Sequence, residues 1–507
     1  MKFNYVNSIS PKINADVYIY FLYRDEKKIS DELKNIEKEL KIKFESQTIK
    51  DFKGKDSQTY LVYQNGKRVL LSGVGKKEKF TLEKLRNSCA RAVKYAENLK
   101  LKKLAVAIFN PQGNGFKYND IITSEVESAI LGTYSFNKYK KKKNDDDADS
   151  KNDDDADSKI NDVTLFGKAG NETDVKKVIR NSQLIAEATV TARDIGNEPG
   201  NFMVPDSFAK FVSREGKKNN YNVKVLNEKE IEKLGMGGVI GVGKGSENKP
   251  RFIIMKYNGG GNKNPIVFVG KGVTFDTGGI SLKGGAGMEN MKMDMNGAAA
   301  VVGIFNAVAA MKLRVNIIGL IPSVENMPSH NSFKPGDILT AYNGMTIEVQ
   351  NTDAEGRLIL ADGVAYANNF KPKYIIDMAT LTGAALVALG HTASIAITND
   401  EELYNKVKTA GIEVHERVWE LPSWDDYDKL IDSDVADVSN LGKGRAAGSI
   451  VAGMFIKRFT GENKWLHLDI AGTGMLPAAA SEYVPKYSSG VGVRLFTKFL
   501  MNEANNN

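Results

Sequence analysis

The chain has 507 residues, 42% of them hydrophobic and 26% charged, so it is long enough to bury a sizeable core without staples. Its single cysteine, Cys89, excludes an intrachain disulfide and favours a reducing compartment, and we therefore expect a cytoplasmic protein. The net charge of +8 comes from scattered lysines and not from a basic stripe, so nucleic-acid binding is not expected. The N-terminal apolar run is short and begins late, which predicts neither a secretory signal nor a membrane span.

Residues 1–170 predict a small α/β domain. Val17 to Tyr23 is an apolar and aromatic run typical of a buried strand. Asn65-Gly66 lies between two strand-like runs, which predicts a hairpin over 60–74. Helices are expected over 81–99 and 121–131.

A low-complexity segment follows this domain. A lysine run at 140–143 precedes NDDDADSK, which occurs twice, at 144–151 and at 152–159. No core forms from such a composition, so we predict a disordered acidic insertion at 140–160. The segment lacks the glycine turn and terminal glutamate of a calcium loop.

A linker helix is predicted over 171–200 and a larger domain over 201–507. In the larger domain, apolar strand candidates alternate with helical segments, which predicts an α/β sheet covered on both faces. Functional sites gather at the strand ends of such sheets. The clearest strand candidates are 252–257, 266–269, 317–321 and 374–378.

Charged residues are embedded in glycine-rich or apolar surroundings in three segments of the larger domain. VGKGVTFDTGGISLK, at 269–283, contains Lys271, Asp276 and Lys283, and its glycines allow backbone to approach a ligand closely. MKMDMNGAAA, at 291–300, places Asp294 among methionines and alanines, where a carboxylate has to be exposed or compensated.

The third segment is NTDAEGRL, at 351–358. Asp353, Glu355 and Arg357 recur there at a spacing of two, so an extended conformation would project all three to one side. Two carboxylates on one side repel each other unless a cation lies between them.

Together the three segments supply four carboxylates and no histidine. Four carboxylates in one pocket have the capacity to hold two divalent ions about 3.5–4 Å apart. Because the ligands are oxygen-rich, Mg, Mn or Zn would suit such a site. Surface salt bridges remain the alternative interpretation of any single one of these charges.

NTDAEGRL also matches, at every position, the signature of the leucyl aminopeptidase family of di-metal cytosolic exopeptidases. The resemblance is dense over about residues 160–495 and loose before them. Further segments that are similar to the family are VGKGVTFDTGG, MKMDMNGAAA, PSVENMPS at 322–329, PGD at 335–337, DMATLTGA at 377–384, SDVADVSNLG at 433–442, AAGSI at 446–450 and HLDIAGT at 467–473.

The resemblance implies a role for each matched residue. Two metals would be bound. The more exchangeable of them would be held by Lys271, Asp276, Asp294 and Glu355, and the tighter one by Asp276, Asp353 and Glu355. Lys283 would polarise the scissile carbonyl, and Arg357 would bind a bicarbonate ion that acts as general base. The pocket for the N-terminal side chain would be lined by Met291, Thr380, Gly383 and Ala471.

The resemblance also implies how the whole protein is built and what it acts on. We expect two α/β domains, the larger with a mixed central sheet flanked by helices, and a homohexamer. The two metals would be Zn or Mn, with Mg or Co also open, and the substrates would be peptides with a leucine-like N-terminal residue. Two alternatives from other classes are a two-metal phosphoesterase and a DNA-binding relative with the same fold.

Overall fold

A computed structural model describes residues 1–9, 13–24, 29–110, 115–141, 159–444 and 446–505. Most of the predicted acidic insertion at 140–160 lies outside these residues. The chain divides into two compact units, residues 1–186 with 481–485, and residues 187–480 with 486–507. Helix α5 (Glu172–Asn197) runs through the boundary between them. The domain limits of 1–170, 171–200 and 201–507 remain our proposal.

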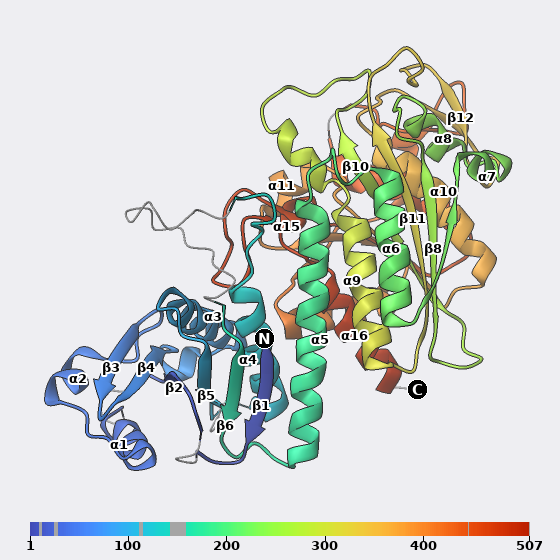
Figure 1. The fold of residues 1–507 in the computed structure, drawn as a ribbon. Helices are drawn as coiled ribbons and strands as arrows, with labels where there is room; N and C mark the ends of the chain where they lie inside the picture. Colours follow the sequence, from blue (N-terminus) through green and yellow to red (C-terminus); the bar gives the residue numbers. More distant parts are fainter. Residues whose placement is uncertain (10–12, 25–28, 111–114, 142–158, 445, 506–507) are drawn as a thin grey trace. The chain divides into compact units, whose positions relative to one another are not determined.

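The N-terminal unit contains, in the described residues, a six-stranded sheet in the order β1-β6-β5-β2-β4-β3 (Figure 1). All neighbouring strands are parallel except β3 and β4, which form the predicted hairpin around Asn65-Gly66. Its strands are β1 (Lys2–Val6), β2 (Val17–Leu22), β3 (Thr59–Gln64), β4 (Lys67–Gly73), β5 (Lys103–Ala107) and β6 (Asp162–Phe166). Its helices are α1 (Ile29–Leu40), α2 (Ser46–Asp51), η1 (Lys77–Lys79), α3 (Leu82–Asn98) and α4 (Tyr118–Gly132).

Helices cover both faces of this sheet, and as a result every residue of strand β2 is buried. Side chains alternate along a strand, so odd-numbered residues of β2 join one hydrophobic cluster and even-numbered residues join another. The first cluster includes helices α3 and α4, and the second includes α1. The N-terminal unit therefore has three layers, as predicted for an α/β domain.

The C-terminal unit is built on a larger mixed sheet, in the order β16-β15-β18-β14-β9-β11-β8-β7, with β10 pairing to β11, as counted over the described residues. Three neighbouring pairs are antiparallel: β7 with β8, β8 with β11, and β15 with β18. The other neighbouring pairs are parallel. The strands are β7 (Asn222–Leu226), β8 (Arg251–Asn258), β9 (Ile266–Gly270), β10 (Gly272–Asp276), β11 (Asn316–Asn326), β14 (Tyr374–Ala379), β15 (Ser394–Thr398), β16 (Val418–Glu420) and β18 (Trp465–Asp469).

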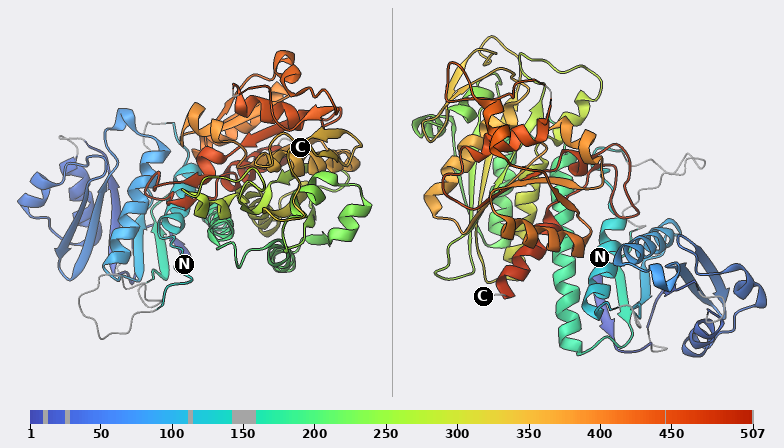
Figure 2. Two further views of the ribbon diagram at one scale, coloured as in Figure 1. Left: turned by 90° about the horizontal axis from the view of Figure 1, so that it is seen from above. Right: turned by 180° about the vertical axis from the view of Figure 1, so that it is seen from behind.

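Helices cover both faces of the large sheet as well (Figure 2). On one face, Phe268 of β9 packs against Phe496 at a ring distance of 5.4 Å. On the other face, Val267 and Val269 join the cluster that contains helix α10. The helices are α6 (Pro205–Asn219), α7 (Glu228–Lys233), α8 (Gly237–Gly243), η2 (Met288–Met293), α9 (Asn296–Met311), α10 (Glu355–Ala367), η3 (Asn368–Phe370), α11 (Gly383–Leu389), α12 (Glu401–Val414), α13 (Asp425–Asp428), η4 (Lys429–Ile431), α14 (Gly448–Lys457), α15 (Ala471–Gly474) and α16 (Val493–Asn505).

Two small sheets complete the C-terminal unit. They consist of β12 (Ile338–Thr340), β13 (Thr346–Glu348) and β17 (Val438–Ser439), and of β19 (Met475–Leu476) with β20 (Tyr487–Ser488). Among the described residues, one helical stretch, Met288–Met311, is long and apolar enough by composition to cross a membrane. Because 94% of its most apolar window is buried inside the protein, it has the properties of a core helix.

Candidate active site: a carboxylate and lysine cluster

The charged residues singled out in the sequence lie at the ends of the strands in the large sheet. Lys271 stands between β9 and β10, and Asp276 ends β10. Asp294 follows η2, and Glu355 is the first residue of α10. Parallel β9 and β14 bring the chain to the same edge, so segments far apart in sequence meet there.

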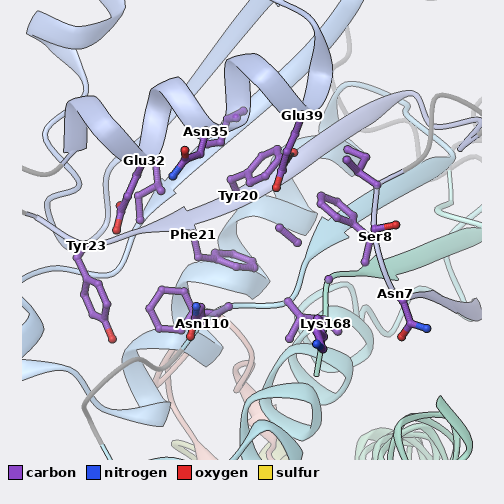
Figure 3. A pocket seen from close by; sticks show the side chains of 18 of the residues that line it. Asn7, Ser8, Tyr20, Phe21, Tyr23, Glu32, Asn35, Glu39, Asn110 and Lys168 are labelled. Carbon is purple, nitrogen blue, oxygen red and sulfur yellow. Dashed lines mark hydrogen bonds between the residues drawn. The ribbon is translucent and has the colours of Figure 1, made fainter. Parts of the chain in front are cut away.

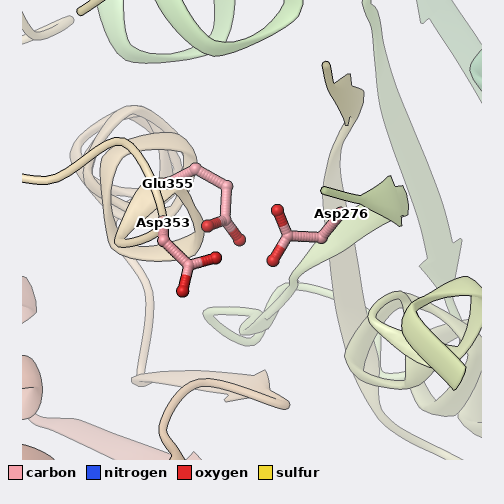
Figure 4. A group of neighbouring side chains, drawn as sticks. All are labelled: Asp276, Asp353 and Glu355. Atoms are coloured by element: carbon pink, nitrogen blue, oxygen red, sulfur yellow. The ribbon is translucent and has the colours of Figure 1, made fainter. Parts of the chain in front are cut away.

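The NTDAEGRL segment is not extended, and that part of the sequence interpretation is wrong. Asp353 lies in a turn, and Glu355 and Arg357 belong to the first turn of helix α10. Asp353 and Glu355 nevertheless converge, together with Asp276, so that one oxygen from each lies within 4.8 Å of the others (Figure 4). A turn followed by a helix thus brings the carboxylates of Asp353 and Glu355 together, as an extended strand would also have done.

Lys271 links the fourth carboxylate to this group. Its ammonium nitrogen lies 2.7 Å from Oδ2 of Asp294 and 2.9 Å from Oε1 of Glu355. It also donates to the carbonyl oxygen of Thr380 at 3.2 Å. The side chains of Lys271, Asp294, Glu355 and Thr380 are all buried. Asp294, which the sequence required to be exposed or compensated, is therefore buried and compensated.

The side chain of Lys271 explains why position 356, between Glu355 and Arg357, is a glycine. A Cβ at position 356 would lie 2.6 Å from Cε and 2.7 Å from Nζ of Lys271. The aliphatic stem of Lys271 therefore passes over the backbone of the helix start, and only glycine leaves the room for it.

Lys283 pairs with the other two carboxylates. Its ammonium lies 2.8 Å from Oδ2 of Asp276 and also forms an ion pair with Asp353. At 24% exposure, Lys283 reaches solvent more than Lys271 does. The structure thus places two lysines among four carboxylates, with Lys283 nearer to solvent than Lys271.

Backbone and amide groups hold Asp276 in place. Its Oδ1 accepts from the backbone N–H of Gly278 at 2.8 Å and from the Nδ2 of Asn326 at 2.9 Å. Asn326 also donates to the carbonyl of Thr352 at 3.0 Å, which ties β11 to the turn before Asp353. Asn326 belongs to the PSVENMPS segment, but its role was not predicted, because an isolated asparagine is not distinctive in sequence.

Burial changes the protonation of the cluster. Burial, and next the charge of Asp276, raise the pKa of Glu355 to about 8. Burial raises the pKa of Asp294 to about 6, although Lys271 acts in the opposite direction. Burial lowers the pKa of Lys271, but Asp294, Glu355 and Asp276 together outweigh it and raise that pKa. The metal-free cluster therefore gains excess negative charge as the pH rises and these two buried carboxyl groups ionise.

This charge imbalance predicts that the metal-free protein loses stability as the pH rises. Because the pKa of Glu355 is higher in the folded than in the unfolded chain, its ionisation opposes folding between about pH 4.5 and about pH 8. In chelated protein at pH 8, Glu355→Gln should raise the melting temperature by about 5 °C. Thermal unfolding at pH 5 and pH 8 measures this, with exposed Glu462→Gln as the matched control. A lower melting temperature of Glu355→Gln at pH 8 would contradict it.

The carboxylate oxygens fit divalent ions. Oδ2 of Asp294, Oδ1 of Asp353 and Oε1 of Glu355 are buried atoms that make ion pairs but no directed hydrogen bond. Oxygen ligands suit Mg, Mn or Zn, and the carboxylates of Asp276, Asp353 and Glu355 converge closely enough to share one ion. The residues present therefore fit the metal centre that the sequence predicted.

Arg357 lies beside the carboxylates and is almost fully buried. Burial lowers the pKa of its guanidinium to about 10, while Glu355 and Asp469 act in the opposite direction. One guanidinium nitrogen, Nη1, donates to the carbonyl of Asn440 at 2.9 Å. Nε is buried and makes no hydrogen bond within the described residues. A free buried N–H of this kind fits a small anion.

Of the four predicted pocket residues, Thr380 is tied most directly to the cluster, because its hydroxyl donates to Oδ1 of Asp294 at 2.8 Å. Met291 lies half-buried in η2, and Gly383 begins helix α11. Ala471 is buried at the start of α15.

Asp469 joins two of the segments that carry these pocket residues. It accepts from the backbone N–H of Leu381 at 3.2 Å, from the hydroxyl of Thr382 at 2.7 Å and from the N–H of Ala471 at 3.1 Å. Its position in HLDIAGT was the only signal in the sequence. The structure thus identifies Asp469 as a residue that holds the 380–383 loop against the start of α15.

Convergent carboxylates at the strand ends of an α/β sheet are the features of a protein that binds divalent ions. Two family models match the chain: the N-terminal domain of the cytosol aminopeptidase family over residues 19–143, and its catalytic domain over residues 190–497. The chain belongs to the cytosol aminopeptidase family, and it is a metal-dependent aminopeptidase. The resemblance found in the sequence, and the expectation of two α/β domains, are confirmed.

Curated relatives extend over most of the chain. The probable cytosol aminopeptidase of Geobacter sp. (strain M21) is 41% identical over 456 residues, which are 89% of this chain and 90% of the relative. That of Alkaliphilus oremlandii (strain OhILAs) is 38% identical over 500 residues, 97% of this chain and 98% of the relative. These relatives support neither a phosphoesterase nor a DNA-binding protein.

Solved structures are also similar. The bottromycin maturation enzyme BotP matches with a TM-score of 0.83 at 26% identity, covering 97% of this chain and all of that one. A structure of BotP in complex with Mn matches with a TM-score of 0.84 at 27% identity, over the same shares of the two chains.

Proposed function

We propose that this enzyme uses two divalent ions to release leucine-like residues from the N-termini of peptides. The observation that carries the proposal is the convergence of Asp276, Asp353 and Glu355, with Asp294 joined to them through Lys271. We assign one ion to Lys271, Asp276, Asp294 and Glu355, and a second to Asp276, Asp353 and Glu355. Zn or Mn is our first choice, with Mg or Co also open. The Mn in a BotP structure supports manganese.

The bound ions would supply Lewis acidity, which lowers the pKa of water toward neutrality and provides a partner for the free amine of the substrate. For Lys271 to act as a ligand, its ammonium has to lose a proton. The carboxylates around it favour the charged form, so a nearby dication would have to reverse that balance.

Lys283 would stabilise the charge that develops on the scissile carbonyl oxygen. Its ammonium is already held by Asp276 and Asp353 and is partly exposed, so a substrate carbonyl can reach it. A positioned cation stabilises such an oxyanion by about 3–4 kcal/mol.

Lys283→Met should therefore lower kcat about 10²- to 10³-fold and leave the metal content unchanged. Steady-state hydrolysis of leucyl p-nitroanilide, together with metal analysis of the purified protein, measures both quantities. Exposed Lys229→Met on helix α7 is the matched control. A kcat within threefold of wild type would remove Lys283 from the catalytic residues.

Arg357 would hold a bicarbonate ion that supplies the general base. The Nε of this buried guanidinium, which makes no hydrogen bond to a described residue, supports the assignment because it offers a donor to an anion. Asn440 fixes the arginine: its carbonyl accepts from Nη1, and its side-chain amide donates to the carbonyl of Asn351 at 2.7 Å.

The substrate side chain would lie against Met291, Thr380, Gly383 and Ala471. All four are uncharged and two are small, which suits an apolar leucine-like residue. We further propose a homohexamer in the cytoplasm. The family description and the buried single cysteine support the compartment, and sedimentation of an active monomer would contradict the hexamer.

The proposed activity is tested by comparing substrates that differ in one group. Leucyl amide should be hydrolysed in the presence of Mn²⁺ or Zn²⁺, whereas N-acetyl-leucyl amide should not, because its blocked amine cannot bind a metal. A phosphate ester serves as the probe for the phosphoesterase alternative. Equal rates with the free and the blocked amide would contradict an aminopeptidase.

A further inference from the structure

A crevice of about 700 Å³ lies in the N-terminal unit, whereas the residues assigned to catalysis belong to the C-terminal unit. It opens at the carboxyl ends of the parallel strands β1, β2, β5 and β6. Its volume lies within the range of about 300–1,000 Å³ that is usual for small-molecule sites.

The topology makes this edge of the sheet a place where ligands bind. Strands β2 and β5 are neighbours, but the helices that follow them, α1 and α4, pack on opposite faces of the sheet. The two connections therefore diverge and leave a gap above the strand ends. In open α/β sheets, ligands occupy the crevice at such a switch point.

The floor of the crevice is aromatic. Phe21 of β2 and Phe109 after β5 line it, and both are at least 94% buried. Phe109 is held by its backbone N–H, which donates to Oε1 of the buried Glu125 at 2.9 Å. The floor is therefore rigid and apolar, and suits an apolar side chain.

The two walls carry opposite charges. Helix α1 presents Glu32 and Glu39 on one side, and Lys168, after β6, lies across the crevice from them (Figure 3). The hydroxyl of Tyr20 donates to Oε2 of Glu39 at 3.1 Å and holds that carboxylate at the wall. Lys77 adds a second cation to the lining, and neither lysine forms an ion pair with another described residue.

We propose that this crevice binds a zwitterionic α-amino acid or short peptide with an apolar side chain. The ammonium would pair with Glu39 of α1, the carboxylate with Lys168 or Lys77, and the side chain would lie on the aromatic floor. Opposite charges on the two walls favour a zwitterion over a nucleotide with several negative charges. If the proposed function holds, the ligand class is that of the released product, and the crevice is a product-sensing site.

Calorimetric titration of the full-length, metal-free Asp353→Ala protein tests the proposal without turnover. L-leucine should bind, and leucinamide and N-acetyl-leucine, which each lack one charge, should bind at least tenfold more weakly. Glu39→Gln and Lys168→Gln should each weaken leucine binding three- to tenfold. The matched exposed controls, Glu45→Gln and Lys43→Gln, should not weaken it.

Three results would overturn the proposal: no leucine binding, binding that ignores both crevice variants, or tighter binding of AMP that those variants abolish. The third would assign the crevice to nucleotides. Glu39→Gln and Lys168→Gln introduced into the wild-type, metal-loaded enzyme should leave leucyl amide hydrolysis intact, which shows that the variants fold. Leucyl amide hydrolysis tests the proposed function, and leucine binding tests only the crevice. The two measurements therefore show which of the two proposals has failed.

Discussion

Removal of divalent ions with a chelator should lower leucyl amide hydrolysis at least about 10³-fold, because both the nucleophile and the binding of the free amine depend on the ions. Addition of Mn²⁺ or Zn²⁺ to the chelated protein should restore the activity. Four carboxylates around two lysines form a site that favours the binding of divalent cations. Initial rates before chelation, after chelation and after each addition measure the effect.

The control for this experiment is the fold of the chelated protein. Circular dichroism should show unchanged secondary structure, because the cluster lies at the sheet edge and the hydrophobic cores do not depend on it. Full activity in protein that metal analysis shows to be free of divalent ions would refute the metal-dependent mechanism.

Asp353→Ala should lower kcat/KM by about 10³-fold and reduce the metal content below two ions per chain. Asp353 is one of the three carboxylates that converge, and it is one of the ion-pair partners of Lys283. Its side chain is 31% exposed and lies in a turn, so the substitution leaves no cavity in the core and the protein should still fold.

Asp434→Ala is the matched control, because Asp434 is exposed and lies in the same unit. Its kcat/KM should stay within about twofold of wild type. A wild-type rate for Asp353→Ala, with two ions still bound, would remove Asp353 from the metal ligands. An inactive protein with a lowered melting temperature and normal metal content would instead assign Asp353 to folding.

Much of the fold follows from local pattern. The hairpin around Asn65-Gly66 and strand β9 lie where the sequence placed them. Helix α10 is instructive, because an extended chain was considered for 351–358, which includes the first turn of this helix. Alternating charges are compatible with a strand, but the helix begins at Glu355, where its buried residues face the large sheet. Tertiary burial decided the conformation there.

The candidate site divides in the same way. The identity of Lys271, Asp276, Asp294, Asp353 and Glu355 as candidate ligands came from side-chain chemistry and from resemblance, both of which are present in a linear sequence. The pairing of Lys271 with Asp294 and Glu355, and of Lys283 with Asp276 and Asp353, joins positions up to 84 residues apart. No local pattern encodes those pairs.

The sequence by itself determined the family and several of the helices and strands, because these depend on residue identity and on short-range periodicity. Only the tertiary structure decided that Asn326 holds Asp276 and that Asp469 ties the 380–383 loop to α15. It alone revealed the crevice above β2 and β5. Each of these features arises where strand ends distant in sequence meet at one edge of a sheet, and that meeting is a property of the packed chain.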